Sequence, residues 1–409
     1  MRVCFLTHYF PPEVGAPQTR IELLARTLAA RGATVTVHTG FPHYPSGVIP
    51  APYRNRPWRV EHRDGITVVR SAVYAAANRG FARRLADHAA LALSALATAR
   101  LSGPLDVVVG ETPPLFTAAS GAVYARGKRA AYVINVADRW PASAVELGAL
   151  RDPRAIAAAS ALERWTYRHA DLVIAPTQGI LDAIATLPEA SGKARRVWPV
   201  VDLNRFDPRP PTPPSAPGTA LRLLFAGTVG LAHGLDVLVE ASRLAGPKIV
   251  RTTIAGDGAD GERIRALVAA RQVANVRMLG TVAAARVTEL YATSDAAAVL
   301  LRDLEIFKGA LPTKMFEAMA AGRALLVAAR GEAAELVRRA GAGLVVAPGD
   351  PAALAGACER LHSDPRLRLE LGQAGRRYAE AHLGAHRAAD AWTAELSDAV
   401  LRRACAQPA

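Results

Sequence analysis

The pattern of apolar and polar residues divides the chain into short apolar runs that alternate with amphipathic segments. Residues 2–10 are mostly apolar and read as a strand, a loop rich in Pro and Gly follows, residues 19–30 have a helical pattern, and residues 34–40 read as a second strand. This order of strand, helix and strand predicts the start of a parallel sheet with helices on both faces. The first half contains further predicted strands at residues 63–73, 106–112, 130–137, 172–177 and 195–201.

A second series of strands begins after a segment that is dense in proline. Residues 208–217 can form neither a helix nor a central strand, and they predict a linker. Beyond them the strands are expected at residues 221–227, 248–255, 276–280, 296–301, 324–329 and 343–347, and the chain is helical from about residue 365. The prediction is an α/β fold of two Rossmann-like, doubly wound domains. It places them at residues 1–204 and 220–375, with a linker at 205–219 and C-terminal helices at 376–409.

The most informative segment of the second half is residues 305–329. Pro312 stands where a helix would begin and Gly322 where it would end, which is the usual placement of these two residues. The apolar run 324–329 that follows is typical of a buried parallel strand. A helix that opens from the loop Gly309, Ala310 and Leu311 presents unpaired N–H groups at its positive end, and such an end can bind a phosphate.

Two charged residues lie on this predicted helix. Lys314 is in the first turn, and Glu317 shares its face because residues three apart are neighbours on a helix. A cation for a diphosphate and a carboxylate for sugar hydroxyls would suit a bound nucleotide. The alternative is an ordinary Lys–Glu pair on the surface of a core helix.

Composition limits the classes of function. The chain has 409 residues, 51% of them hydrophobic, a net charge of +14 and a pI near 10.3, so an anionic substrate, nucleic acid or membrane surface is expected. Its 3 cysteines form neither a disulfide framework nor a metal-binding motif. We expect no signal peptide, and the longest apolar stretch, residues 89–99, is too short to span a bilayer. A cytoplasmic protein is expected.

Several motifs of other enzyme classes fail or are missing. Residues 255–261, AGDGADG, contain a G-x-G-x-x-G pattern, but no acidic residue occurs near the end of the next predicted strand, as a dinucleotide site would require. The sequence has no P-loop, no Asp-x-Asp and no G-x-S-x-G motif. These observations argue against NAD enzymes, P-loop NTPases and metal-dependent single-domain transferases.

Three segments resemble one enzyme family. The segment ALPTKMFEAMAAGRALL is similar to the donor-site signature of the family-4 glycosyltransferases, which are retaining enzymes with the two-domain GT-B fold. HYFPPEVGAPQTRIELLARTLAARG resembles their N-terminal signature, and NVADRWPASAVELG resembles the loop that approaches the reacting sugar. The likeness is greatest to transferases that build bacterial surface polysaccharides.

The resemblance implies two domains that face each other across a cleft, with the last helix crossing back to the first domain. It also implies a nucleotide-sugar donor, UDP-linked rather than GDP-linked, whose diphosphate pairs with Lys314 and whose ribose binds Glu317. The implied donor-binding residues are Gly15, Ala16, Gly227, Thr228, Gly309, Ala310, Leu311, Pro312, Thr313, Lys314 and Glu317. Two departures stand out: Gly309 replaces a family Glu near the donor sugar, and His233 stands where many members have an Arg and a Lys.

Asp138 and Lys314 are the implied catalytic residues. Many relatives carry His or Ser immediately before the position of Asp138, but this chain has Ala137, so Asp138 is the remaining polar candidate. The alternative for Asp138 is a structural cap of the following helix. No cofactor and no metal ion are expected, since Lys314 and a helix N-terminus would supply the positive charge.

The acceptor is expected to bind the first domain. Arg79, Arg83 and Arg84 precede the apolar helix that contains residues 89–99, and such a segment can lie on an anionic membrane. Together with the resemblance, this predicts a lipid-linked acceptor and peripheral binding to the inner face of the plasma membrane. An ordinary core helix with a solvated end remains the alternative.

Three other functions are left open. The enzyme could use a soluble acceptor, or it could be a phosphorylase or epimerase of the same fold. A non-enzymatic nucleic-acid binder is a further alternative, but the arginines are spread over both halves and the aromatic residues are few, so no nucleic-acid partner is expected.

Overall fold

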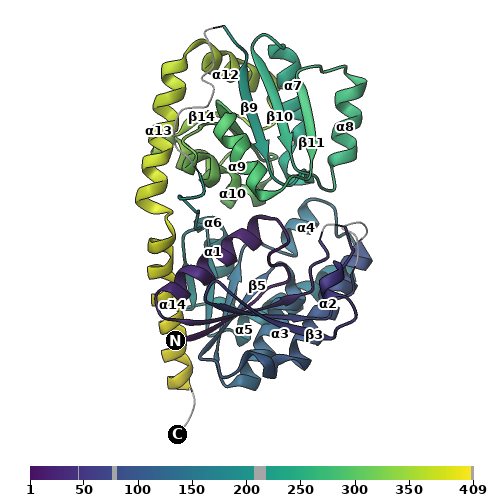
Figure 1. Cartoon of the computed structure of the whole chain (residues 1–409), viewed down its shortest axis with the longest axis vertical. Helices are drawn as coiled ribbons and strands as arrows, with labels where there is room; N and C mark the ends of the chain where they lie inside the picture. The colour runs from purple at the N-terminus through teal and green to yellow at the C-terminus, as the bar shows by residue number, and fades with distance from the viewer. Residues whose placement is uncertain (45, 76–80, 207–217, 407–409) are drawn as a thin grey trace. The chain divides into compact units, whose positions relative to one another are not determined.

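The structure is a computed structural model that describes residues 1–44, 46–75, 81–206 and 218–406 (Figure 1). The chain forms two compact units. Unit 1 contains Met1–Val200 and Ala385–Ala409, and unit 2 contains Val201–Gly384. Of the predicted linker at 205–219, residues 207–217 lie outside the described residues, and the first segment of unit 1 ends at Val200 instead of the predicted residue 204.

Unit 1 is built on a sheet whose eight described strands have the order β3-β4-β2-β1-β5-β6-β7-β8. Neighbouring strands are parallel except β3 and β4. The strands are β1 (Arg2–Leu6), β2 (Thr34–Gly40), β3 (Trp58–Arg63), β4 (Ile66–Ser71), β5 (Val107–Thr112), β6 (Ala131–Val136), β7 (Leu172–Ala175) and β8 (Ala194–Arg196). The helices are α1 (Ala16–Ala30), α2 (Phe81–Ala97), α3 (Leu115–Lys128), α4 (Ala142–Glu146), α5 (Pro153–His169), α6 (Gln178–Ala185) and α14 (Ala385–Ala406), with short 3₁₀ turns η1 (Ala51–Tyr53), η2 (Ala99–Ser102) and η3 (Pro188–Ala190).

The single strand predicted at 63–73 is a hairpin in the structure. Asp64 and Gly65 have positive φ angles of 52° and 77° and connect β3 to β4 as a two-residue turn. Asp-Gly is a preferred sequence for such a turn, because both central residues must adopt positive φ. The sequence signal for this hairpin was therefore present and was missed.

The two faces of the unit 1 sheet carry separate cores. Val3 and Phe5 point to the face that is covered by α1 and α14, whereas Cys4 and Leu6 point to the face covered by α2, α3 and α5. On the first face, Trp392 of α14 makes an edge contact with Phe5, with ring centroids 6.2 Å apart. The prediction that the last helix packs on the first domain is confirmed.

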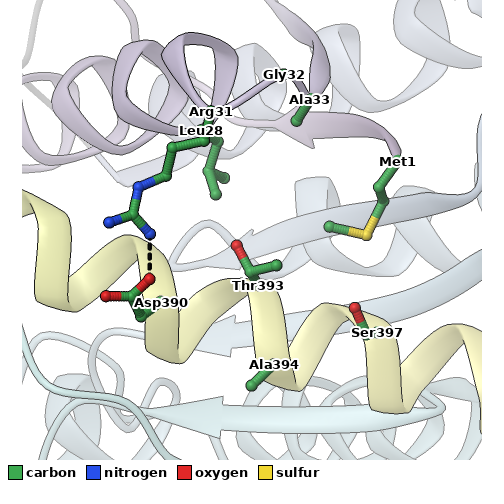
Figure 2. A pocket seen from close by; sticks show the side chains of 9 residues that line it. All are labelled: Met1, Leu28, Arg31, Gly32, Ala33, Asp390, Thr393, Ala394 and Ser397. Carbon is green, nitrogen blue, oxygen red and sulfur yellow. Dashed lines mark hydrogen bonds and ion pairs between the residues drawn. The ribbon is translucent and has the colours of Figure 1, made fainter.

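A pocket of about 490 Å³ lies between α14 and the α1–β2 turn (Figure 2). Arg31 and Asp390 form an ion pair at its wall. Met1 and Ala33, which also line the pocket, directly precede β1 and β2, so the pocket lies at the edge of the sheet where the strands begin. Ligands of open α/β sheets bind at the opposite edge, beyond the carboxyl ends of the strands. This pocket is therefore not the predicted site.

Unit 2 contains a six-stranded parallel sheet with the order β11-β10-β9-β12-β13-β14. Numbered within the unit, this is the 3-2-1-4-5-6 order of a Rossmann fold, so the predicted fold class is confirmed. The strands are β9 (Leu221–Ala226), β10 (Val250–Ala255), β11 (Val276–Gly280), β12 (Ala296–Leu300), β13 (Ala324–Ala328) and β14 (Gly343–Val346). The helices are α7 (Leu235–Ala245), α8 (Gly261–Ala270), α9 (Ala284–Thr293), α10 (Thr313–Ala320), α11 (Glu332–Ala340), α12 (Pro351–Ser363) and α13 (Pro365–His382), with 3₁₀ turns η4 (Leu231–His233) and η5 (Glu305–Gly309).

The strand order of unit 2 places its ligand crevice. The order reverses between β9 and β12, and ligands of such sheets bind beyond the carboxyl ends of the strands at this point. The turn after β9 begins at Gly227, and the segment after β12 leads through η5 into α10.

The C-terminal boundary differs from the predicted position. Helix α13 runs through residues 375 and 376 without a break, and the chain passes from unit 2 to unit 1 at Gly384 and Ala385. The predicted helical region is thus two helices that are separated by Leu383 and Gly384.

Candidate functional site

The segment 309–313 connects η5 to α10 in unit 2 and is half-buried. Pro312 is the N-cap of α10, and among the described residues no side chain caps this end of the helix. Proline at this position has a fixed φ that suits a helix start, and it contributes no N–H donor of its own. The amino end of α10 therefore keeps backbone donors and a partial positive charge for a ligand.

Lys314 is buried at this helix end, with a relative exposure of 8%. Its Nζ lies 3.8 Å from the centroid of the Phe225 ring, at the end of β9. Burial lowers the pKa of Lys314 from 10.5 to about 7, although the carboxylate of Glu317 acts in the opposite direction. The surface Lys–Glu pair that the sequence left open is thus excluded.

His233 contacts the same lysine. Its Nδ1 donates to the carbonyl oxygen of Leu300 at 3.1 Å, which leaves Nε2 as an acceptor for the ammonium of Lys314 at 3.3 Å. Burial and the nearby lysine lower the pKa of His233 to about 3, so the ring is neutral at physiological pH. The histidine that stands in place of basic family residues therefore adds no charge but orients Lys314.

The turn that follows β9 borders the same lysine. A Cβ atom added at Gly227 would lie 3.1 Å from Cε and 3.4 Å from Nζ of Lys314. The turn is also packed closely against the one after β10, since a Cβ at Gly256 would lie 1.8 Å from the carbonyl oxygen of Gly227. A Cβ at Gly258 would lie 2.6 Å from the carbonyl oxygen of Val229. This packing explains Gly256 and Gly258 of the G-x-G-x-x-G pattern without a dinucleotide.

Glu317 lies one turn further along α10 and is close to Arg205. The Oε1 atom of Glu317 is 3.9 Å from Nη1 of Arg205. Arg205 itself donates to the carbonyl oxygen of Ala284 at 2.8 Å and to the hydroxyl of Thr288 at 3.2 Å, which fixes its position. Burial raises the pKa of Glu317, and the charges of Arg205 and Lys314 oppose this shift.

Sequence reasoning missed Arg205, which it assigned to the linker. The residue is separated from α10 by most of unit 2, and no motif marks it. Only the fold places Arg205 next to α9 and α10, where it contacts Thr288 and Glu317.

In unit 1, Gly15 is the N-cap of α1, and Ala16 is the first residue of the helix. A Cβ at Gly15 would lie 2.4 Å from Oε1 of Gln18, so the side chain of Gln18 fills the space beside the glycine. In the part of the chain that the structure describes, no side chain caps α1. The structure thus gives Gly15 a packing role and leaves its predicted contact with a phosphate as a prediction.

Asp138 follows β6, at the carboxyl edge of the unit 1 sheet. Its Oδ1 accepts from the backbone N–H of Arg139 and its Oδ2 from the hydroxyl of Ser143, both at 2.8 Å. Burial raises the pKa of Asp138, and these hydrogen bonds oppose the shift. Both oxygens have partners around the start of α4, so the carboxylate shapes this loop, and its catalytic role remains a prediction.

The basic segment before the apolar helix is only partly described. Arg79 lies outside the described residues, whereas Arg83 and Arg84 are exposed in the first turn of α2. Further along α2, Leu93 is 70% exposed and lies on an apolar groove of about 360 Å³ that is formed with α3 and α5. Within the described residues, no helix is both long and apolar enough to cross a membrane.

Two protein-family models match the chain. Residues 15–199 match the model described as glycosyl transferase 4-like domain, and residues 212–378 match the model described as glycosyl transferases group 1. No curated protein sequence matches.

Solved structures with a similar fold cover nearly the whole chain. Sucrose-phosphate synthase from Thermosynechococcus elongatus has 17% identity and a TM-score of 0.76, and the match covers 96% of this chain and 97% of that one. Anabaena Alr3699/HepE in complex with UDP-glucose has 17% identity and a TM-score of 0.69, with coverages of 97% and 99%. WaaG, a glycosyltransferase involved in lipopolysaccharide biosynthesis, has 18% identity and a TM-score of 0.65, with coverages of 96% and 98%.

Proposed function

Because the chain belongs to the glycosyltransferases of the GT-B fold, we propose that it transfers a glycosyl group from a UDP-linked sugar to a hydroxyl group of an acceptor. The observation that carries the proposal is the buried Lys314 at the uncapped start of α10. The choice of UDP is supported by the similar HepE structure, which contains UDP-glucose.

The environment of Lys314 favours an anionic ligand. A buried ammonium is costly unless it is paired, and the ring of Phe225 and the neutral His233 compensate its charge only in part. A diphosphate beside Nζ and the N–H groups of α10 would supply the missing negative charge and would raise the pKa of the lysine again. The bound state is thus an ammonium paired with a diphosphate.

The same contact would promote the reaction. When the bond between the sugar and the diphosphate breaks, negative charge grows on the leaving oxygen, and Lys314 and the helix dipole stabilise it. Interactions that are stronger in the transition state than in the ground state raise turnover. Retention of configuration is proposed by family analogy, with the leaving phosphate helping to deprotonate the acceptor hydroxyl. No metal ion is needed for this step.

Glu317 is proposed to bind the ribose hydroxyls. Arg205 would keep the Glu317 carboxylate ionised and oriented when a nucleotide enters. Gly309 has no side chain to contact the donor sugar, so this position would contribute backbone groups only.

We propose that the acceptor is lipid-linked and that unit 1 binds it at an anionic membrane surface. The exposed Arg83 and Arg84 and the apolar groove beside Leu93 support this assignment, because basic and apolar groups together favour such a surface. The likeness to WaaG, whose description names lipopolysaccharide biosynthesis, supports it as well.

The proposal is tested with a panel of nucleotide sugars. Purified protein is incubated with UDP-linked and GDP-linked sugars, with and without a lipid-linked or a soluble acceptor, and release of UDP or GDP is measured. We expect turnover of a UDP-sugar and a reduction of about tenfold to a hundredfold in Lys314→Met, since a charge-assisted contact contributes about 1.5–3 kcal/mol. UDP affinity should fall less than turnover.

Lys308→Met is the matched control, because Lys308 lies in η5, just before the segment 309–313, and its side chain is 43% exposed and paired with Glu305. It should retain the activity of the wild type. Unchanged turnover in Lys314→Met would contradict the donor-site assignment, and transfer to a soluble acceptor alone would contradict the lipid-linked acceptor.

A further inference from the structure

A cluster of two histidines and an aspartate lies in unit 1, apart from the residues discussed above. His8 follows β1, His43 follows β2, and Asp87 lies on α2. All three side chains are buried, with relative exposures of 2%, 3% and 2%. The Nε2 atoms of His8 and His43 are each 2.9 Å from the same oxygen, Oδ2 of Asp87.

The second oxygen of the aspartate is not used. In the described part of the chain, Oδ1 of Asp87 is buried and has no hydrogen-bond partner. A buried carboxylate oxygen without a partner is costly, and native structures rarely tolerate one without a reason. The arrangement therefore lacks one interaction on the side of the aspartate.

His43 has the orientation of a metal ligand. Its Nδ1 lies 2.9 Å from the carbonyl oxygen of Phe41 and must donate to it, which directs Nε2 at the centre of the cluster. Histidines that bind metals commonly donate their other ring N–H to a backbone carbonyl in this way.

We propose that His8, His43 and Asp87 bind a zinc ion through the two Nε2 atoms and both oxygens of the carboxylate. One ligand atom from each residue already lies within 4.8 Å of the others. Zn²⁺ prefers ligand atoms at about 2.0–2.2 Å, and in a tetrahedral arrangement atoms of different residues are then about 3.3 Å apart, whereas the two oxygens of one carboxylate stay closer because they share a carbon atom. The 2.9 Å contacts between the two Nε2 atoms and Oδ2 of Asp87 need to lengthen by a few tenths of an ångström, and the two Nε2 atoms, which lie within 4.8 Å of each other, have to reach the same spacing.

The ligand types favour zinc over the hard cations. Imidazole nitrogens suit Zn²⁺ and related transition metals, whereas Mg²⁺ and Ca²⁺ prefer oxygen ligands. The sequence contained no metal motif because the three residues are far apart along the chain.

The zinc would join three elements. His8 and His43 fix the ends of the central strands β1 and β2, and Asp87 fixes α2 against them. The role is structural and does not depend on the proposed transfer reaction, so the tests below do not use activity.

The test uses the full chain and Zn²⁺ alone. After exposure to Zn²⁺ and dialysis against metal-free buffer, elemental analysis should find one zinc per chain, and the unfolding temperature should rise by several degrees. X-ray absorption at the zinc edge should show two imidazole ligands at about 2.0–2.1 Å. This measurement needs only the wild type and remains decisive if a variant does not fold.

Loss of a residue that only hydrogen-bonds to a metal ligand weakens metal binding by about 10–100-fold. Asp87→Asn and His43→Gln remove a ligand itself and should weaken zinc binding by more than this. His88→Gln is the control: the His88 ring lies 4.7 Å from the His8 ring, but His88 is not one of the three ligands. Failure to retain one zinc per chain would overturn the proposal. Equal binding in the wild type and Asp87→Asn, or a spectrum without imidazole, would overturn it as well.

Discussion

Replacement of Lys314 by methionine should stabilise the protein while it abolishes most of the activity. The side chains have similar lengths, but methionine carries no charge into the buried site. Burial lowers the pKa of Lys314 from 10.5 to about 7. At about 1.36 kcal/mol for each pKa unit, the buried ammonium costs about 5 kcal/mol of folding free energy.

The cost depends on pH in a defined direction. Below pH 7 the lysine is protonated in the folded and unfolded chains, and the whole cost is present. Between pH 7 and 10.5 only the unfolded chain keeps the proton, so the free energy of unfolding of the wild type rises by about 1.4 kcal/mol per pH unit. Methionine has no such dependence. The Lys314→Met variant loses the hydrogen bond to His233, and this loss offsets about 1–3 kcal/mol of the stability gained by removing the buried charge.

The assay is urea unfolding of the nucleotide-free wild type and Lys314→Met at pH 6 and pH 9. We expect the variant to be more stable by about 2 kcal/mol or more at pH 6, and its advantage to shrink by about 2.7 kcal/mol at pH 9. Lys308→Met, which removes an exposed lysine, is the control. A variant that is less stable than the wild type at pH 6, or a difference that does not change with pH, would refute the desolvation of Lys314.

Four other predictions follow from the same structure. Glu317→Ala should weaken UDP binding with little change in turnover of bound donor, as measured by calorimetry and initial rates, and wild-type affinity would exclude the ribose contact. Asp138→Asn should leave UDP binding intact and reduce transfer; a loss of stability with unchanged specific activity would show that the residue only shapes its loop. Initial transfer rates should be unchanged by EDTA. A loss of activity that Mn²⁺ or Mg²⁺ restores would contradict this prediction. A slow loss that only Zn²⁺ restores would instead point to the cluster of His8, His43 and Asp87. Sedimentation with anionic liposomes should be sensitive to salt and should fall when Arg79, Arg83 and Arg84 are changed to Gln, since three basic residues contribute about 3 kcal/mol; equal binding to neutral vesicles would refute it.

Much of the fold was accessible from the sequence because it depends on local patterns. The run 324–329 is apolar throughout and the run 221–227 is apolar except for Arg222, as expected for parallel strands with both faces covered. Pro312 and Gly322 marked the ends of α10, because one has a fixed φ and the other adopts a positive φ of 65°. The hairpin turn at Asp64 and Gly65 had an equally local signal, the Asp-Gly pair, but residues 63–73 were predicted as one strand and the turn was missed.

The candidate donor site was predictable only in part. Lys314 and Glu317 could be named because they are neighbours on one helix. The sequence could not show that Lys314 is buried against Phe225 and donates a hydrogen bond to His233. Nor could it show that Arg205 lies beside Glu317. Those residues come from four separate segments, and their spacing along the chain has no fixed relation to their distance in space.

The cluster of His8, His43 and Asp87 shows the same division. The sequence placed His8 near the end of the first predicted strand, residues 2–10, and His43 just after the second, residues 34–40, so both were expected near the carboxyl edge of one sheet. Only the tertiary structure decided that α2 brings Asp87 between them, at 2.9 Å from each ring. Strand and helix positions depend on the preferences of adjacent residues, but contacts between elements depend on how their faces pack, and that is decided by the whole core.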